Sequence, residues 1–143
     1  MMIYSTVCKP GEIFYGRVNN SSEEIRRFKV LSILITEAKG ISYYCESYPV
    51  ENNNHSLTCH FSEEDFKNLM FKTPEAAKID FENRKRLYES MNDYNREIHF
   101  EENLNIARKL IENHIIKINQ LQKFCDFSEN EFLYVKDLFQ KQM

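Results

Sequence analysis

Hydrophobic and polar residues follow two different periods along this chain. Up to about residue 73, short apolar runs alternate with polar residues and are separated by turn-forming residues, which is typical of β-strands. After that point, apolar residues recur at intervals of three, four and seven, which is the period of helices. We therefore expect an α+β fold, with a β-rich half over residues 1–73 and a helical half over residues 74–143, packed as one compact unit.

Glycine and proline support this division, because all three Gly and all three Pro lie at or before Pro74. Glycine and proline punctuate turns, so turns are expected mainly in the first half. Thr73, Pro74 and Glu75 form a strong helix start: threonine accepts free backbone N–H groups, proline suits the first turn, and glutamate complements the helix dipole. The boundary between the halves is therefore predicted at Thr73-Pro74.

The first half is expected to form a small, curved sheet. In its second apolar run the pattern changes phase at Leu31, which predicts either a β-bulge there or burial of the strand on both faces. A later run alternates cleanly, so Leu57, Cys59 and Phe61 are expected on its core face. Turns are expected after residue 18, at Lys39-Gly40 and at residues 52–54. The predicted strands cover residues 12–18, 25–36, 41–48, 55–61 and 69–71.

Helix signals fill the rest of the chain. Ser62 can cap a short turn through Asp65, and Ser128 with Glu131 forms a capping box for a last helix that ends near residue 140. A first long helix should break near residues 92–95. A second should run from 101 to 124, with an apolar arc wide enough to need two neighbours or a partner chain. The seam residues predicted to form this interface are Leu104, Ile111, His114, Ile118 and Leu121.

Composition indicates a globular protein: 42% of the 143 residues are hydrophobic, 13% are aromatic and 29% are charged. The net charge of −3 is spread evenly, which makes nucleic-acid binding through a basic segment less favourable. The first residues lack a leader pattern and no apolar run is long enough to span a membrane, so we expect a cytoplasmic protein. The four cysteines show no CxxC spacing, which favours reduced thiols over disulfides.

Three segments carry a resemblance to a known family: PGEIFYGRV, VLSILITEAKGISYYC and FSEEDFKNLMFKTPEAAKIDFE. Over residues 10–86 their order resembles a small SH3-like barrel module of the KOW or Tudor-like kind, common in short accessory proteins of phages and mobile elements of low-GC bacteria. The resemblance implies an N-terminal antiparallel β-barrel, followed here by a helical hairpin or three-helix segment that has no counterpart in it. It is structural rather than catalytic.

Most candidate catalytic or metal-binding groups also have a simpler structural interpretation. Cys59 and His60 are neighbours on a predicted strand, so their side chains should point to opposite faces and cannot easily share a metal ion. Cys59 and Cys45 are therefore interpreted as core thiols. No metal site, cofactor or catalytic residue is predicted. His114 is interpreted as a core or interface histidine, and association through it would be sensitive to mildly acidic pH.

Two charged clusters are likewise interpreted as structural. The consecutive acids at residues 63–65 complement the dipole at a helix start. The basic triplet at residues 84–86 would be spread around a helix, which predicts a solvated face.

Tyrosines of the third predicted strand are the best candidates for recognition. Tyr44 and Tyr48 fall on the face opposite Ile41, Tyr43 and Cys45. Exposed tyrosines can stack on bases or grip peptides, whereas helix packing over the sheet would bury them. The full predicted binding set consists of Tyr44, Tyr48, Arg26, Arg27 and Lys29.

Two functions follow as hypotheses. The first is a non-enzymatic protein-interaction module, used by a phage or mobile-element accessory protein to modulate, by inhibition, a host factor. Its partner would be that protein or, through the helical half, a second copy of the chain. The alternative is a nucleic-acid-binding module that uses the barrel tyrosines and basic residues.

Overall fold

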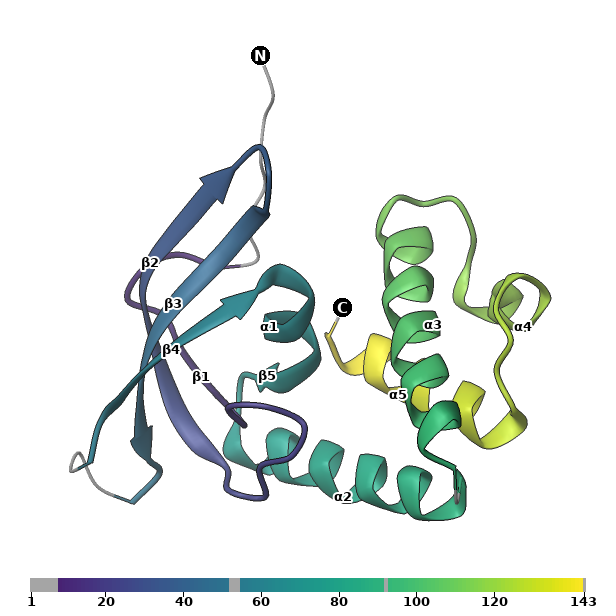
Figure 1. Ribbon diagram of the computed structural model, residues 1–143, viewed down its shortest axis with the longest axis horizontal. Coiled ribbons are helices and arrows are strands. Elements are labelled where there is room, and N and C mark those ends of the chain that lie inside the picture. Colours follow the sequence, from purple (N-terminus) through teal and green to yellow (C-terminus); the bar gives the residue numbers. More distant parts are fainter. Residues whose placement is uncertain (1–7, 52–54, 92, 143) are drawn as a thin grey trace. The chain divides into compact units, whose positions relative to one another are not determined.

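The computed structural model describes residues 8–51, 55–91 and 93–142. Its contacts divide the chain into two compact units, residues 1–79 and residues 80–143. The first unit contains the strands, one short helix and the beginning of a long helix, and the second is helical (Figure 1). The predicted α+β class is therefore confirmed. The turn predicted at residues 52–54 lies outside the described residues.

The first unit is built on a five-stranded antiparallel sheet with the strand order β4-β3-β2-β1-β5. The sheet is open in this order, and the short helix α1 connects β4 to β5. Every strand predicted from the alternating pattern is present. The elements are β1 Ile13–Gly16, β2 Arg26–Thr36, β3 Gly40–Pro49, β4 Leu57–Ser62, α1 Glu63–Leu69 and β5 Met70–Phe71.

A β-bulge in β2 explains the broken apolar pattern of that strand. The pairing of β2 with β3 shifts between Val30 and Ser32, so Leu31 is the extra residue. Before the bulge Val30 lies opposite Cys45, and after it Ile33 lies opposite Tyr43. The predicted bulge is confirmed. Because one inserted residue exchanges the two faces, β2 keeps its apolar side chains on the core side across the change of phase.

Aromatic rings form the centre of the first unit. Phe66 of α1 stacks on Tyr43, with 4.3 Å between the ring centres, and meets Phe14 edge to face at 5.1 Å. Phe28 and Tyr43 are completely buried. Removing such side chains from water stabilises a fold by about 1.5–3 kcal/mol each. Ser62 positions α1 as predicted, because its Oγ accepts the backbone N–H of Asp65 at 3.2 Å.

One core prediction in this unit is wrong. Leu57 was expected on the core face of β4, but 53% of its surface is exposed. Cys59 is half-buried, and only Phe61 of the three expected residues is fully in the core. Leu57 is the first residue of β4, and the core does not extend as far as that end of the strand.

Gly16 allows the last strand to reach the first. Gly16 of β1 pairs with Met70 of β5. A Cβ atom at position 16 would lie 1.9 Å from the backbone oxygen of Leu69, a distance that no side chain can tolerate. The close approach of β5 to β1 therefore requires glycine at this position.

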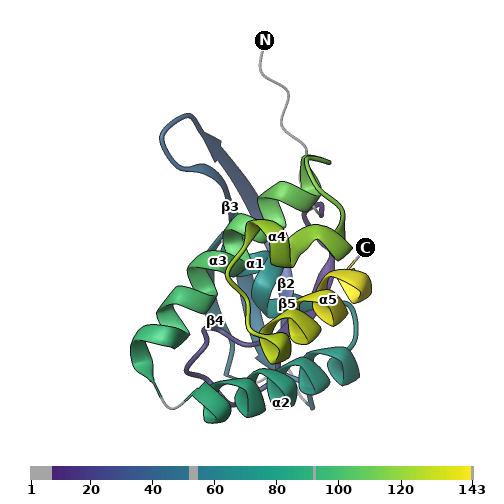
Figure 2. The same cartoon turned by 90° about the vertical axis from the view of Figure 1, so that its right-hand side faces the viewer.

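The second unit is formed by helices (Figure 2). The Thr73-Pro74 helix start is confirmed, because Thr73 Oγ1 accepts the N–H of Ala76 at 3.1 Å; α2 begins in the first unit and continues into the second. The capping box of Ser128 and Glu131 is also present. The elements are α2 Pro74–Met91, α3 Tyr94–Glu112, the 3₁₀ helix η1 Ile118–Gln120, α4 Leu121–Phe124 and α5 Glu129–Gln142.

The single helix predicted from residue 101 to residue 124 is wrong. α3 ends at Glu112, and His114 adopts a left-handed backbone conformation with φ of 56°. The N–H of His114 bonds to Ile111 O at 3.1 Å and that of Ile115 to Leu110 O at 3.0 Å. This pair of bonds is the Schellman motif, which normally uses glycine at the left-handed position.

The predicted interface seam is therefore not one helix face. Leu104 and Leu121 are completely buried, so their surfaces are occupied within the folded chain. Ile111 and Ile118 are half-buried. His114 is exposed in the turn, so the interpretation of this residue as a core histidine is wrong. Association through these residues remains a prediction.

Candidate functional site on the sheet

The face of the sheet opposite the aromatic core carries the predicted tyrosines. Along β3, Tyr43 and Cys45 are completely buried, whereas Tyr44 and Tyr48 are partly exposed. The predicted alternation of β3 is therefore confirmed. Since residues paired across an antiparallel sheet point to the same side, the strand register identifies the neighbours of the two tyrosines.

These neighbours come from three other segments of sequence. Arg27 lies between Tyr48 and Tyr15 in the register, and His60 lies opposite Tyr44. Lys29 and Glu46 form a further cross-strand pair. We call this surface the tyrosine face, and it consists of Tyr15, Arg27, Lys29, Tyr44, Glu46, Tyr48 and His60.

Two ring contacts organise the tyrosine face. The guanidinium carbon of Arg27 lies 5.3 Å from the centre of the Tyr48 ring, within the range of cation–π attraction. The rings of Tyr44 and His60 lie 4.7 Å apart and are tilted by 40°. A hydrogen bond to Glu46 raises the pKa of the Tyr48 hydroxyl above its ordinary value. The face therefore offers aromatic surface held by cross-strand contacts, and the Tyr48 hydroxyl keeps its proton.

The charges of the tyrosine face are mixed. Arg27 and Lys29 are basic, and Glu46 lies directly opposite Lys29. A phosphate backbone attracts cations and repels carboxylates, so this arrangement is less suited to a polyanion than a uniformly basic surface would be. Aromatic rings surrounded by groups of both signs are typical of surfaces that recognise other proteins.

The expectation that Arg26 contributes to a binding surface is wrong. Arg26 is buried, and its Nε donates to Ser47 Oγ at 3.0 Å. Its other nitrogens bond to His55 O at 2.9 Å and to the carboxylate of Glu24 at 2.9 Å. In a strand, consecutive side chains point to opposite faces, so Arg26 and Arg27 cannot serve the same surface. Arg26 instead holds the ends of the strands together.

Cys59 and His60 point to opposite sides of β4, as expected. Cys59 pairs with Cys45 across the sheet, whereas His60 contacts Tyr44. Burial raises the pKa of Cys45 to about 12 and that of Cys8 to about 11. These two thiols stay protonated at neutral pH, and a thiol in that state is a poor nucleophile and metal ligand. Among the described residues, no group of three or more His, Cys, Asp or Glu side chains is placed to hold a metal ion.

A buried polar network in the second unit was not found from the sequence. Arg84 is only 2% exposed, so the prediction that it lies on a solvated face is wrong, although Lys85 and Arg86 are exposed. Arg84 Nε donates to Tyr134 Oη at 2.8 Å, and its Nη1 lies 3.1 Å from a carboxylate oxygen of Glu101.

The network extends on both sides of Arg84. The Tyr134 hydroxyl donates to Asp80, and the Tyr88 hydroxyl donates to Glu101. Burial raises the pKa of Tyr134 above its ordinary value, Arg84 opposes this shift and Asp80 adds to it. The network links α2, α3 and α5, and Arg84 and Glu101 form an ion pair within it. Asp80, Arg84 and Tyr88 follow one another at intervals of four and therefore share one face of α2. Glu101 and Tyr134 lie on two other helices, and no spacing in the sequence relates them to that face.

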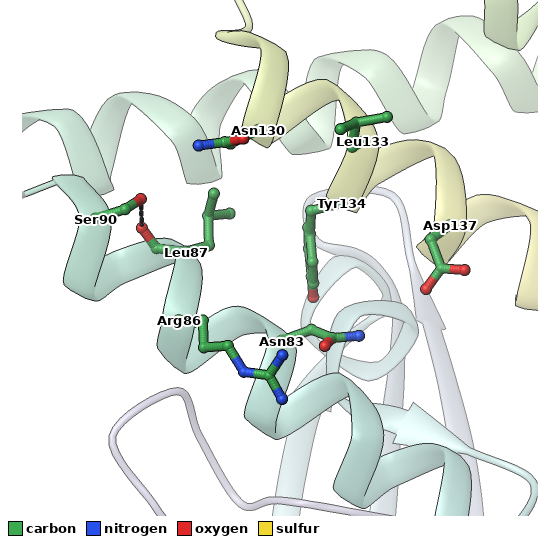
Figure 3. A pocket seen from close by; sticks show the side chains of 8 residues that line it. All are labelled: Asn83, Arg86, Leu87, Ser90, Asn130, Leu133, Tyr134 and Asp137. Atoms are coloured by element: carbon green, nitrogen blue, oxygen red, sulfur yellow. Dashed lines mark hydrogen bonds between the residues drawn. The ribbon is translucent and has the colours of Figure 1, made fainter.

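A groove of about 440 Å³ lies beside this network, between α2 and α5 (Figure 3). The Tyr134 hydroxyl is already bonded to Asp80 and Arg84, and Ser90 Oγ donates to Leu87 O at 2.6 Å. Both hydroxyl groups that line the groove therefore already donate a hydrogen bond within the second unit. Its lining residues are Asn83, Arg86, Leu87, Ser90, Asn130, Leu133, Tyr134 and Asp137.

Comparisons with protein-family models, with curated proteins and with solved structures gave no significant match. Within the described parts of the chain, no helix combines the length and the apolar character needed to cross a membrane.

Proposed function

We propose that this chain is a non-enzymatic protein-interaction module that binds a partner protein through its tyrosine face. The observation that carries the proposal is the gathering of partly exposed Tyr44 and Tyr48 with Arg27 on one side of the sheet. Tyrosine and arginine contribute disproportionately to protein interfaces because they combine large apolar surface with polar groups. The partner would be a host factor that the protein inhibits, as the resemblance to phage and mobile-element accessory proteins implies.

We also propose that the first unit is a small SH3-like barrel. Three features support this assignment: the strand order with β5 beside β1, the bulge in the long strand β2, and the short helix between β4 and β5. Small barrels of this kind offer exposed rings of their sheet for recognition. The proposed fold and the proposed use of the tyrosine face therefore agree.

Binding of single-stranded nucleic acid is the second candidate. It is favoured by the same partly exposed Tyr44 and Tyr48, on which bases could stack, and by Arg27 and Lys29. Glu46 within the face and the net charge of −3 weigh against it. The two candidates differ in their dependence on salt, because release of counterions makes nucleic-acid binding weaken steeply as salt rises.

The test compares wild-type protein with the double variant Tyr44→Ala/Tyr48→Ala. Both are immobilised and exposed to a bacterial lysate, and Tyr94→Ala serves as the control because Tyr94 is an exposed tyrosine of the helical unit. We expect the wild type and the control to retain the same protein. The proposal makes these two rings hot spots of the interface, and truncation of a hot-spot residue costs about 2 kcal/mol or more, so the double variant should bind at least about tenfold more weakly.

Three outcomes would reject the protein-binding proposal. They are retention of no protein by the wild type, equal retention by the double variant, and equal loss with Tyr94→Ala. A fluorescent single-stranded oligonucleotide, titrated at low and at high salt, tests the second candidate. Salt-sensitive binding that disappears in the double variant would favour nucleic acid instead.

A further inference from the structure

One edge of β2 is covered over only part of its length. β1 pairs with β2 from Arg26 to Lys29, and Val30 bonds to Gly11 and Glu12 through N···O distances of 2.7 and 3.0 Å. From Ser32 to Thr36, beyond the bulge at Leu31, β2 pairs with β3 on its other side. Across the part of the chain that the structure describes, no strand pairs with this second edge. Among the described residues this part of the edge has no strand partner, and an edge in that state can pair with a further strand.

The open segment is apolar on both faces. Leu31, Leu34 and Ile35 are 45%, 48% and 41% exposed, and no residue from 31 to 36 carries a charge. Ile33 and Ile35 belong to the core side of β2, whereas Leu34 lies on the other side, opposite Ser42. Edge strands are normally protected by a charge, a proline or a further bulge. This segment has the composition of an interior strand although it lies at an edge.

The open segment is also self-complementary. We propose that β2 of a second copy of this chain adds to it in antiparallel orientation, across a two-fold axis at Leu34. Ser32 then faces Thr36, Ile33 faces Ile35, and Leu34 faces its own equivalent. Pairs of β-branched residues and Ser–Thr pairs are favourable across antiparallel strands, and identical surfaces meeting across a two-fold axis form a closed dimer.

The length of the open edge agrees with this register. At one end Gly11 and Glu12 occupy the position beside Val30. At the other end β2 stops at Thr36, and the chain turns at residues 37–39 into β3. A two-fold axis at Leu34 places five residues of each copy, 32–36, between these limits. The pairing uses the edge of β2 and not the rings of the tyrosine face, so it can fail without affecting the proposed function.

Sedimentation velocity over a range of concentrations tests the dimer, with wild type compared to Leu34→Lys. A lysine at the two-fold axis places two charges side by side within an apolar pairing, so we expect the dimer constant to weaken at least tenfold. Leu57→Lys is the matched control, because Leu57 is a similarly exposed leucine on β4, an outer strand at the far end of the same sheet. Circular dichroism establishes that each variant is folded.

A cysteine at the axis tests the register. Directly opposed residues of antiparallel strands have Cα atoms about 4.5–5.5 Å apart, which a disulfide can bridge. Mild oxidation of Leu34→Cys should therefore give a covalent dimer, whereas the wild type with its four cysteines and Leu57→Cys should not. A monomeric wild type at every concentration, an equal effect of Leu57→Lys, or absence of the Leu34→Cys cross-link would overturn the proposal. The proposal would also be overturned if the chain stayed monomeric and the edge of β2 paired only with a strand of a different protein.

Discussion

The hydroxyl of Tyr134 joins two charged side chains of α2 inside the second unit. It accepts a hydrogen bond from Arg84 Nε at 2.8 Å and donates one to Asp80. Both charged residues are buried, so neither can replace this partner with bulk water at no cost. A buried polar group that loses its partner destabilises the fold by about 1–3 kcal/mol.

Tyr134→Phe should therefore lower the free energy of unfolding by about 1–3 kcal/mol, because it deletes only the hydroxyl and leaves the ring in place. Urea-induced unfolding followed by circular dichroism measures the change. Tyr94→Phe makes the same chemical change at an exposed position and should have no measurable effect. Equal stability of Tyr134→Phe and wild type would show that the network does not stabilise the second unit.

Arg26 and Arg27 show which properties of a single residue can be predicted from the sequence and which cannot. Their opposite faces follow from the strand period, and once the core face of β2 is known, Arg26 must lie on it. That a charged residue is tolerated there could not be predicted, because its partners Ser47 and His55 are far away in the sequence. The burial of Arg84 could not be predicted for the same reason, because Glu101 and Tyr134 are also distant from it in the sequence.

Among the elements, the C-terminal end of α3 differs most from the prediction made from the sequence. Local sequence gives little warning, since neither glycine nor proline follows Glu112. Asn113 and His114 are the only signal, because Asn and His tolerate the left-handed conformation better than most residues. By contrast, the starts of α1, α2 and α5 were predicted correctly, since each depends on a side chain within three residues of the backbone group that it caps.

The end of α3 leads to a second prediction. His114→Gly removes the strain of a side chain at φ of 56° and should raise the free energy of unfolding by up to about 1 kcal/mol. Asn113→Gly is the control: Asn113 has φ of −88°, where glycine brings only greater freedom of the unfolded chain. Thermal unfolding compares the two variants. A His114→Gly protein less stable than Asn113→Gly would contradict the proposed origin of the helix end.

On the scale of the whole molecule, the chain keeps buried thiols protonated, and this makes its stability depend on pH. Cys8 and Cys45 have an ordinary pKa of 9.0, and burial raises these values to about 11 and about 12 in the folded chain. Above pH 9 the unfolded chain releases thiol protons that the folded chain retains. Alkaline pH therefore favours the unfolded state.

The free energy of unfolding should be independent of these thiols below about pH 8 and should decrease as the pH rises from about 9 to 12. Urea titrations in the presence of a reductant, repeated at several pH values, measure this dependence. Cys45→Ala should reduce the decrease, although the lost packing lowers stability at every pH. A free energy that stays constant between pH 8 and 11 would contradict burial of the two thiols.

The overall α+β organisation was predictable because it depends on the periods of apolar residues, which extend over many positions, so a few exceptions do not change the result. The order of the strands could not be predicted in this way. Pairing of β1 with β5 joins Gly16 to Met70, residues that no periodicity relates. The division of the chain between residues 79 and 80 falls within the continuous helix α2, and no linker composition in the sequence indicates a boundary there.

Gly16 has a consequence for evolution. The closest collision of a side chain at this position is with the backbone oxygen of Leu69, so exchanging a neighbouring side chain does not remove it. Ile13, half exposed at the other end of the same strand, is under no such constraint. Homologues of this protein should therefore differ at position 13 while retaining glycine at position 16, even where overall sequence identity is low.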